Sequence, residues 1–188
     1  MSATGYAFMA ALQALAAAVV NASADPADAL RLAVDLAQPT QEDGGLAAPS
    51  GSNMARMRGA VADGCRRSAV IALARAAARY QPASHDDALQ VRALVCSVLD
   101  AEITAAGDQG EDATFNALRK LRASVITDLT QRGADLAPIA TFVSADTLPS
   151  LVLAQRHYGD AGRETEMVTQ VNPRHPLFMP VQFKALAS

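Results

Sequence analysis

Residues 139–186 decide the fold, and they read IATFVSADTLPSLVLAQRHYGDAGRETEMVTQVNPRHPLFMPVQFKAL. The β-branched run at 139–143 predicts a short strand. Two helices are expected next, at 149–158 and 163–171, because turn residues bracket both segments. A last extended segment lies within 176–186. The predicted order is strand, helix, helix, strand, which is typical of a small α+β domain.

Cap and turn residues separate these elements. Asp146 or Thr147 is the expected N-cap of the first helix. Gly159 follows that helix and allows a positive φ. Asn172 and Pro173 are expected to end the second helix and to redirect the chain into the final strand.

Upstream of this stretch, the sequence predicts a bundle of three long helices. One helix is expected at about 54–80, and Ser84 to Asp87 resembles a capping box that opens the next. Asp108, with Glu111 three residues on, is the expected cap of the third helix, and Gly133 its C-cap. The short loops between these helices favour antiparallel neighbours. The expected fold is mainly α. It consists of N-terminal helices at 1–37, a Pro- and Gly-rich flexible linker at 38–53, a helical bundle at 54–135 and a small α+β domain at 136–188.

Composition excludes several classes of protein. The chain has 188 residues, 51% of them hydrophobic and 19% charged, so it has enough apolar material for a core and is not a disordered polyampholyte. Sixteen Lys and Arg against 19 Asp and Glu give a formal charge of −3, which argues against a dedicated nucleic-acid binder. Two cysteines, Cys65 and Cys96, are too few for a disulfide scaffold, and both are expected to be buried thiols in a reducing compartment.

The N-terminal segment is nearly all apolar from 6 to 20. This run is shorter than a membrane span needs, so a packed or partner-binding helix is expected, with a secretory signal as the alternative. The helix face expected to contact another chain consists of Tyr6, Phe8, Met9, Leu12, Leu15 and Val19.

Chemistry-bearing motifs are few. His85, His157 and His175 have no Ser, Cys or Asp at a recognisable triad spacing, and no Gly-rich loop precedes a Lys-Ser/Thr pair. We therefore expect no catalytic residues, no cofactor and no metal site.

Arginines are frequent in the expected helix at 54–80. At about 100° per residue they scatter around the axis and form no stripe. A solvated surface with salt bridges is the favoured interpretation, and contact with DNA is the alternative. The arginines concerned are Arg56, Arg58, Arg66, Arg67, Arg75 and Arg79.

The order of elements at the C-terminal end resembles the LysM fold. The matching residues are Asp146, Thr147, Leu148, Leu151, Ala154, Tyr158, Gly159, Asp160, Val168, Asn172, Pro173, Pro180, Val181, Gln182 and Leu186. LysM modules often bind N-acetylglucosamine polymers in a groove between a helix and the following loop. By this resemblance, the groove for a partner protein or a glycan would consist of Asp146, Thr147, Leu148, Asn172, Pro173, Arg174 and His175.

A longer series of motifs extends from about 87 to 186. It comprises DAEI at 100–103, DATFNALR at 112–119, DLTQRG at 128–133, TLPSLVLA at 147–154, YGD at 158–160 and NPRHPLFMP at 172–180. The series resembles the C-terminal part of the Mu-type phage DNA circularisation protein, a tail and baseplate component of contractile phages.

The resemblance implies a structural virion protein, not an enzyme. Such a protein would be made in the bacterial host cytoplasm and assembled into the tail baseplate or hub. Its expected partners are other tail proteins, with a homo-oligomer as a further arrangement. Two alternatives remain, a peptidoglycan-binding module of a cell-puncturing device and a DNA-end binding protein.

Overall fold

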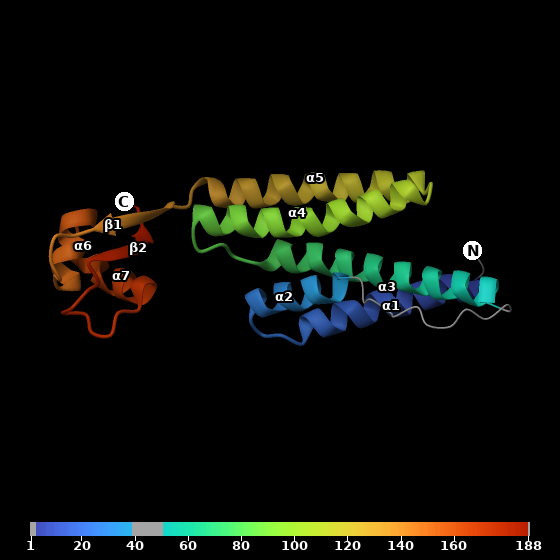
Figure 1. Ribbon diagram of the computed structural model, residues 1–188, viewed down its shortest axis with the longest axis horizontal. Coiled ribbons are helices and arrows are strands. Elements are labelled where there is room, and N and C mark those ends of the chain that lie inside the picture. The colour runs from blue at the N-terminus through green and yellow to red at the C-terminus, as the bar shows by residue number, and fades with distance from the viewer. Residues whose placement is uncertain (1–2, 39–50, 188) are drawn as a thin grey trace. The chain divides into compact units, whose positions relative to one another are not determined.

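The computed structural model describes residues 3–38 and 51–187. Within them the protein is mainly helical, with 73% helix and one two-stranded antiparallel sheet (Figure 1), as the sequence predicts. Most of the linker expected at 38–53 lies outside the described residues, at 39–50. Its last residues are helical, because α3 begins at Gly51. The elements are α1 (Ala3–Asn21), α2 (Pro26–Ala37), α3 (Gly51–Arg79), α4 (His85–Asp108), α5 (Asp112–Ala134), β1 (Ile139–Val143), α6 (Ser150–Tyr158), the 3₁₀ turn η1 (Ala161–Arg163), α7 (Glu164–Val171) and β2 (Gln182–Leu186).

The chain divides into two compact units, which are described separately. The helical unit comprises Met1–Gln81 and Gln90–Thr130, and the C-terminal unit comprises Pro82–Leu89 and Gln131–Ser188. No helix in the described ranges combines the length and the apolar character needed to cross a membrane.

The helical unit is built on small residues. The Asp25 carboxylate accepts the Ala27 N–H at 2.9 Å, and Pro26 follows as the first residue of α2, a position that suits proline. Both α1 and α2 pack against α3. Gly64 of α3 lets α1 approach closely, because a Cβ at this position would lie 3.0 Å from the Met9 sulfur. The core that results is rich in alanine and includes Val20, Ala29, Leu30, Ala33, Val70, Ala72, Leu73, Ala76, Val95, Leu99, Val125 and Leu129.

Two expected caps of the long helices are wrong. The α4 helix continues through Asp108, and the carbonyl of Glu111 instead accepts the Phe115 N–H at 2.9 Å at the start of α5. Gly133 lies inside α5, and a Cβ there would come within 2.7 Å of the Ala88 Cβ. Gly133 therefore serves close packing and not helix termination.

The capping box at the start of α4 is confirmed. The Asp87 N–H donates to the Ser84 hydroxyl at 3.1 Å. In return the Asp87 carboxylate accepts the Ala83 N–H at 2.9 Å, one residue earlier than in the usual box.

The cysteines differ in burial. Cys96 is buried, as expected, but Cys65 is exposed. The buried face of α3 passes through Gly64 and Ser68, and residue 65 lies about 100° away from residue 64 around the helix. The expectation for Cys65 is therefore wrong.

The C-terminal unit is a two-stranded sheet covered by α6 and α7 on one face. The strand expected at 139–143 is confirmed as β1, which pairs antiparallel with β2. Phe142 lies opposite Phe183, and Ala140 opposite Ala185. These four side chains share one face of the sheet, since side chains alternate along a strand. Of these, Phe142, Phe183 and Ala185 pack with the buried residues Leu153, Ala154, Met167 and Met179.

The junctions around α6 and α7 are partly as expected. Gly159 has a φ of 69° and Asn172 a φ of 46°, and both end their helices in the left-handed conformation. The N-cap of α6 is Pro149, with no side-chain cap, so the expectation of Asp146 or Thr147 is wrong. The loop before β2 takes over this role, because the Pro176 carbonyl accepts the Ser150 N–H at 2.8 Å.

Candidate docking site

The residues of the expected LysM-like groove lie on two loops that the fold brings together. The first loop precedes α6, and the second joins α7 to β2. Backbone hydrogen bonds connect them, from the Ser150 N–H to the Pro176 carbonyl at 2.8 Å and from the Met179 N–H to the Leu148 carbonyl at 3.2 Å. Two segments separated by about 25 residues of sequence therefore form one continuous surface.

On the first loop, Asp146 and Thr147 are exposed, and Leu148 is half-buried against the core. The Asp146 carbonyl accepts the Ser144 hydroxyl at 2.8 Å. No residue of the described ranges bonds the Asp146 carboxylate, while the backbone of Asp146 is held in place.

On the second loop, Pro173 is half-buried, and Asn172, Arg174 and His175 are exposed. His175 has a local structural role, because its Nδ1 lies 3.1 Å from the Leu177 N–H. Its ring centroid also lies 6.0 Å from that of Phe178, which is 68% exposed.

A hydrophobic groove runs along α6 beside these loops. We call it the α6 groove, and its volume is about 630 Å³. It is lined by Leu148, Leu151, Val152, Gln155, Arg156 and Ala161. Of the residues expected from the LysM resemblance, the groove contains Leu148.

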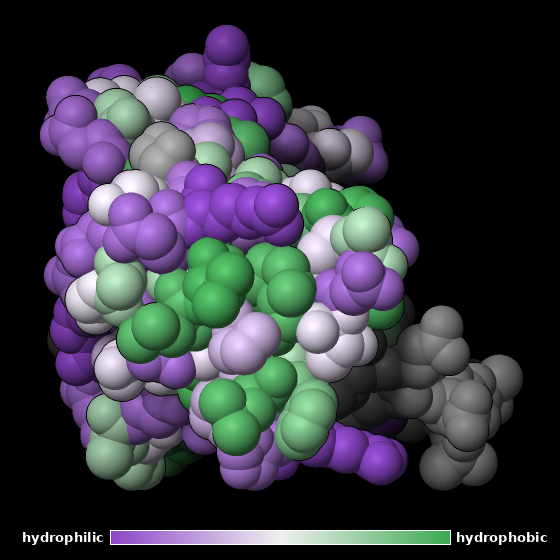
Figure 2. Space-filling model, turned by 90° about the vertical axis from the view of Figure 1, so that its left-hand side faces the viewer, coloured by the Kyte–Doolittle hydropathy of each residue, from purple (hydrophilic) through white to green (hydrophobic). Residues whose placement is uncertain are grey.

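The other lining residues of the α6 groove were missed, although the sequence carries a signal for two of them. Residues 151–154 are all apolar, and a helix as short as α6 buries only one face. Leu153 and Ala154 occupy that face, so Leu151 and Val152 must lie outside it, and they are 52% and 43% exposed. Figure 2 shows hydrophobic side chains gathered on the side of the C-terminal unit that faces the viewer.

Polar residues fix one wall of the α6 groove. The Gln155 side chain donates to the Gly159 carbonyl at 3.2 Å and accepts the Ala161 N–H at 3.1 Å. Arg156 is exposed, and no carboxylate among the described residues forms an ion pair with it. The groove therefore offers an apolar floor with the Arg156 guanidinium at its rim.

The three histidines have structural neighbours. His157 packs on Phe142, with ring centroids 4.3 Å apart, and burial together with the nearby Arg156 charge lowers the pKa of His157. The Nδ1 of His85 lies 2.9 Å from the Gly133 carbonyl. In the part of the chain that the structure describes, no group of three His, Cys, Asp or Glu is placed to hold a metal ion.

In the helical unit, two of the arginines considered for DNA contact are neutralised within the chain. Arg66 and Arg67 each bond through Nε to Glu102, at 3.1 and 3.0 Å, and Glu102 is only 4% exposed. Burial opposes the charged form of both arginines, but the carboxylates outweigh it, so the pKa of each lies above its usual value. This pairing weakens the DNA interpretation.

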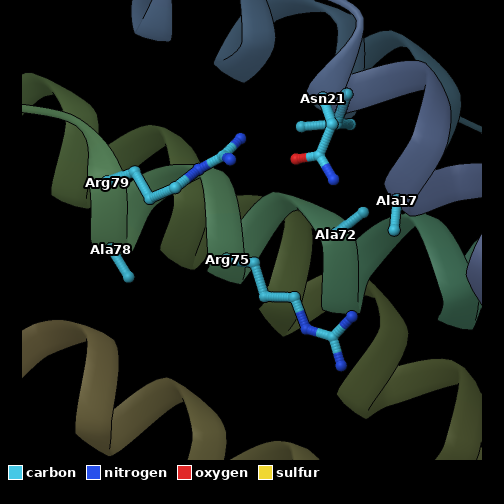
Figure 3. Close-up of a pocket in the computed structure, with 7 residues that line it drawn as sticks. Ala17, Asn21, Ala72, Arg75, Ala78 and Arg79 are labelled. Atoms are coloured by element: carbon cyan, nitrogen blue, oxygen red, sulfur yellow. The ribbon is translucent and has the colours of Figure 1, made fainter.

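Arg75 and Arg79 lie differently, at a second cavity of about 380 Å³ between α1 and α3. Figure 3 shows Arg79 extending from α3 toward Asn21 of α1, with Ala17, Ala72 and Ala78 around the cavity. Neither arginine forms an ion pair with the described residues. Arg56 and Arg58 are also exposed on α3, so four of the six arginines still support the DNA alternative.

The face of α1 expected to contact a partner is divided. Met9 and Leu12 are half-buried and lie against the Gly64 position of α3. Val19 is also half-buried, whereas Tyr6, Phe8 and Leu15 are exposed. Phe8 and Leu15 are two helical turns apart and share the outer face.

No protein-family model matches the chain, and no curated protein matches it either.

Proposed function

We propose that this protein is a structural component of a contractile phage tail, at the baseplate or hub, and that it docks a neighbouring tail protein. The α6 groove carries this proposal. Large apolar side chains that are left exposed around a hollow, on a unit with a complete core of its own, favour burial against another protein.

We further propose that the C-terminal unit is a LysM-like module. Support comes from the order β1, α6, α7, β2, from the antiparallel pairing of the strands, and from the helices on one face of the sheet. The left-handed ends of α6 and α7 at Gly159 and Asn172 agree with the same pattern.

The expected partner has an apolar side chain next to an acidic one. The partner's apolar side chain would fill the floor between Leu151 and Val152, and the carboxylate of its acidic side chain would pair with Arg156. Burial of apolar surface would supply most of the affinity, at roughly 25 cal/mol per Å², while the ion pair would fix the register. Exposed Phe8 and Leu15 on α1 offer a further contact for tail neighbours.

Photo-crosslinking in purified phage particles tests this proposal. A photoreactive phenylalanine analogue replaces Val152 in the α6 groove, and in a matched control it replaces Thr165, which is exposed on α7. We expect a crosslink from position 152 to one identified tail protein and none from position 165. Absence of the protein from purified particles, or equal crosslinking from both positions, would refute the proposal.

The peptidoglycan alternative is tested by sedimentation with purified peptidoglycan. Retention that is lost in Asn172→Ala would favour glycan binding through the two loops over protein docking. We expect no retention, because we propose that this unit docks a protein through the α6 groove and not a glycan through the two loops.

A further inference from the structure

The outer edge of β1 carries backbone groups that no residue in the described ranges bonds. Backbone bonds link Ser144 to Val181 and Ala187 to Pro138 at the two ends of the sheet. In an antiparallel ladder, bonded and non-bonded residues alternate, so the N–H and C=O groups of Ala140 and Phe142 point toward β2. The same groups of Thr141 and Val143 point away from it, and no described residue bonds them.

This edge also lacks the features that usually protect an edge strand. Native proteins blunt such edges with charge, proline or a bulge. The β1 sequence IATFV contains none of these, and it pairs with β2 in an unbroken register. Its outward side chains, Ile139 and Val143, are β-branched and exposed, as is Thr141 between them.

The opposite edge of the sheet is protected. On β2, the Leu186 N–H donates to the Gln170 side chain at 2.9 Å, and Lys184 places an exposed charge on that strand. The α7 helix also packs beside β2. Only the β1 edge is therefore available for pairing in the described part of this sheet.

We propose that the β1 edge pairs antiparallel with the β1 edge of a second copy of this chain. A row of outward N–H and C=O groups is satisfied by another strand. Because β1 is uncharged, two copies approach without repulsion. Its exposed β-branched side chains favour a strand as the occupant.

The free groups select one register, with the two-fold axis at Phe142. Thr141 of each copy then lies opposite Val143 of the other, and every free N–H meets a free C=O. A register centred on Thr141 would instead bring Val143 opposite Ile139. That arrangement is poorer, because the Ile139 N–H is already bonded to the Asp86 carboxylate at 2.5 Å. Asp86 therefore limits the pairing to the second half of the strand.

Sedimentation velocity of the full chain over a concentration series tests the inference. The contact is short, so we expect a weak dimer that forms between about 10 μM and about 1 mM. Val143→Lys should weaken association at least tenfold, because it places two like charges at diagonally neighbouring positions across the new edge and puts a charge on the strand that must pair. Gln182→Lys is the matched control, since Gln182 lies opposite Val143 on the same face but one strand away from the edge. It should leave association unchanged.

Thr141→Pro is a second variant. It removes a donor that points away from β2 and so leaves the β1–β2 ladder intact. Far-UV circular dichroism of each variant checks the fold. Hydrogen exchange adds an independent readout, in which the amides of Thr141 and Val143 become protected as concentration rises, whereas the Ile139 amide is protected throughout by Asp86.

A protein that stays monomeric up to about 1 mM would overturn the inference. A dimer that resists both Val143→Lys and Thr141→Pro but is lost in Leu15→Ser would also overturn it, by assigning the contact to α1. The α6 groove is not part of this contact. Failure here and failure of the crosslinking experiment at position 152 are therefore separate results.

Discussion

Replacement of Glu102 by alanine should destabilise the helical unit strongly. The Glu102 carboxylate is 4% exposed and accepts bonds from Arg66 and Arg67. Removing one partner of a buried ion pair costs about 3–5 kcal/mol, because the remaining charge stays buried and unpaired.

In this protein the cost should be lower than that range. Each arginine side chain is about one-fifth exposed and keeps a second carboxylate, Asp63 for Arg66 and Glu111 for Arg67. We therefore expect a loss of about 2–3 kcal/mol in the free energy of unfolding.

Urea unfolding followed by circular dichroism measures this loss. With a slope of about 2 kcal/mol per M, the midpoint should fall by about 1–1.5 M. Asp100→Ala is the control, since Asp100 lies on the same helix and pairs with Arg122 at a solvent-exposed position. Its midpoint should stay close to that of the parent. Equal shifts for the two variants would refute a stabilising role of the buried network.

Three further predictions concern single positions. Gly133→Ala should lower the free energy of unfolding by about 1–3 kcal/mol, although alanine has the better helix propensity, because the new Cβ would lie 2.7 Å from the Ala88 Cβ. Adding Ala88→Gly to the same chain should restore part of the loss, as measured by urea midpoints. Burial, aided by Arg156, lowers the pKa of His157 below 6.5, so the unfolded chain takes up the proton first as the pH falls. The stability that the neutral ring contributes is therefore present above pH 6.5 and is lost below it. His157→Phe should reduce the difference between the urea midpoints measured at about pH 7.5 and about pH 5.5. An unchanged difference would show that His157 is not the origin of this pH dependence. Cys65 should react rapidly with a thiol reagent because it is exposed, whereas Cys96 should react only on unfolding because burial raises its pKa. A fast phase that persists in Cys65→Ser would contradict the assignment of that phase to Cys65.

Local signals sufficed for much of the C-terminal unit. The strand at 139–143 was predicted with its observed bounds, because proline and serine bracket a short β-branched run. The left-handed ends at Gly159 and Asn172 were predictable for the same reason, since few residue types adopt that conformation. Both inferences depend on a few adjacent residues.

Features that depend on distant residues were not predictable. Glu102 lies 35 residues after Arg67, and nothing in either helix alone indicates that they meet. The first turn of α6 depends on Pro176, so the local preference for Asp146 or Thr147 as a cap was misleading.

The α6 groove was only partly predictable. A run of four apolar residues on a short helix shows that some must be exposed, but not which face they occupy. That face is set by packing against Phe142 and Phe183 from strands on either side in the sequence.

The Glu102 network also bears on the order of folding events. Glu102 and Glu111 lie on the hairpin formed by α4 and α5, a local structure with a short turn, whereas Arg67 precedes them by 35 and 44 residues. Local hairpins close sooner than contacts with long intervening chain. The carboxylates of the α4–α5 hairpin should then be in place before α3 docks, and the ion pairs with Arg66 and Arg67 would form late in folding. In kinetic experiments, the Glu102 substitution should therefore accelerate unfolding and leave the refolding rate almost unchanged.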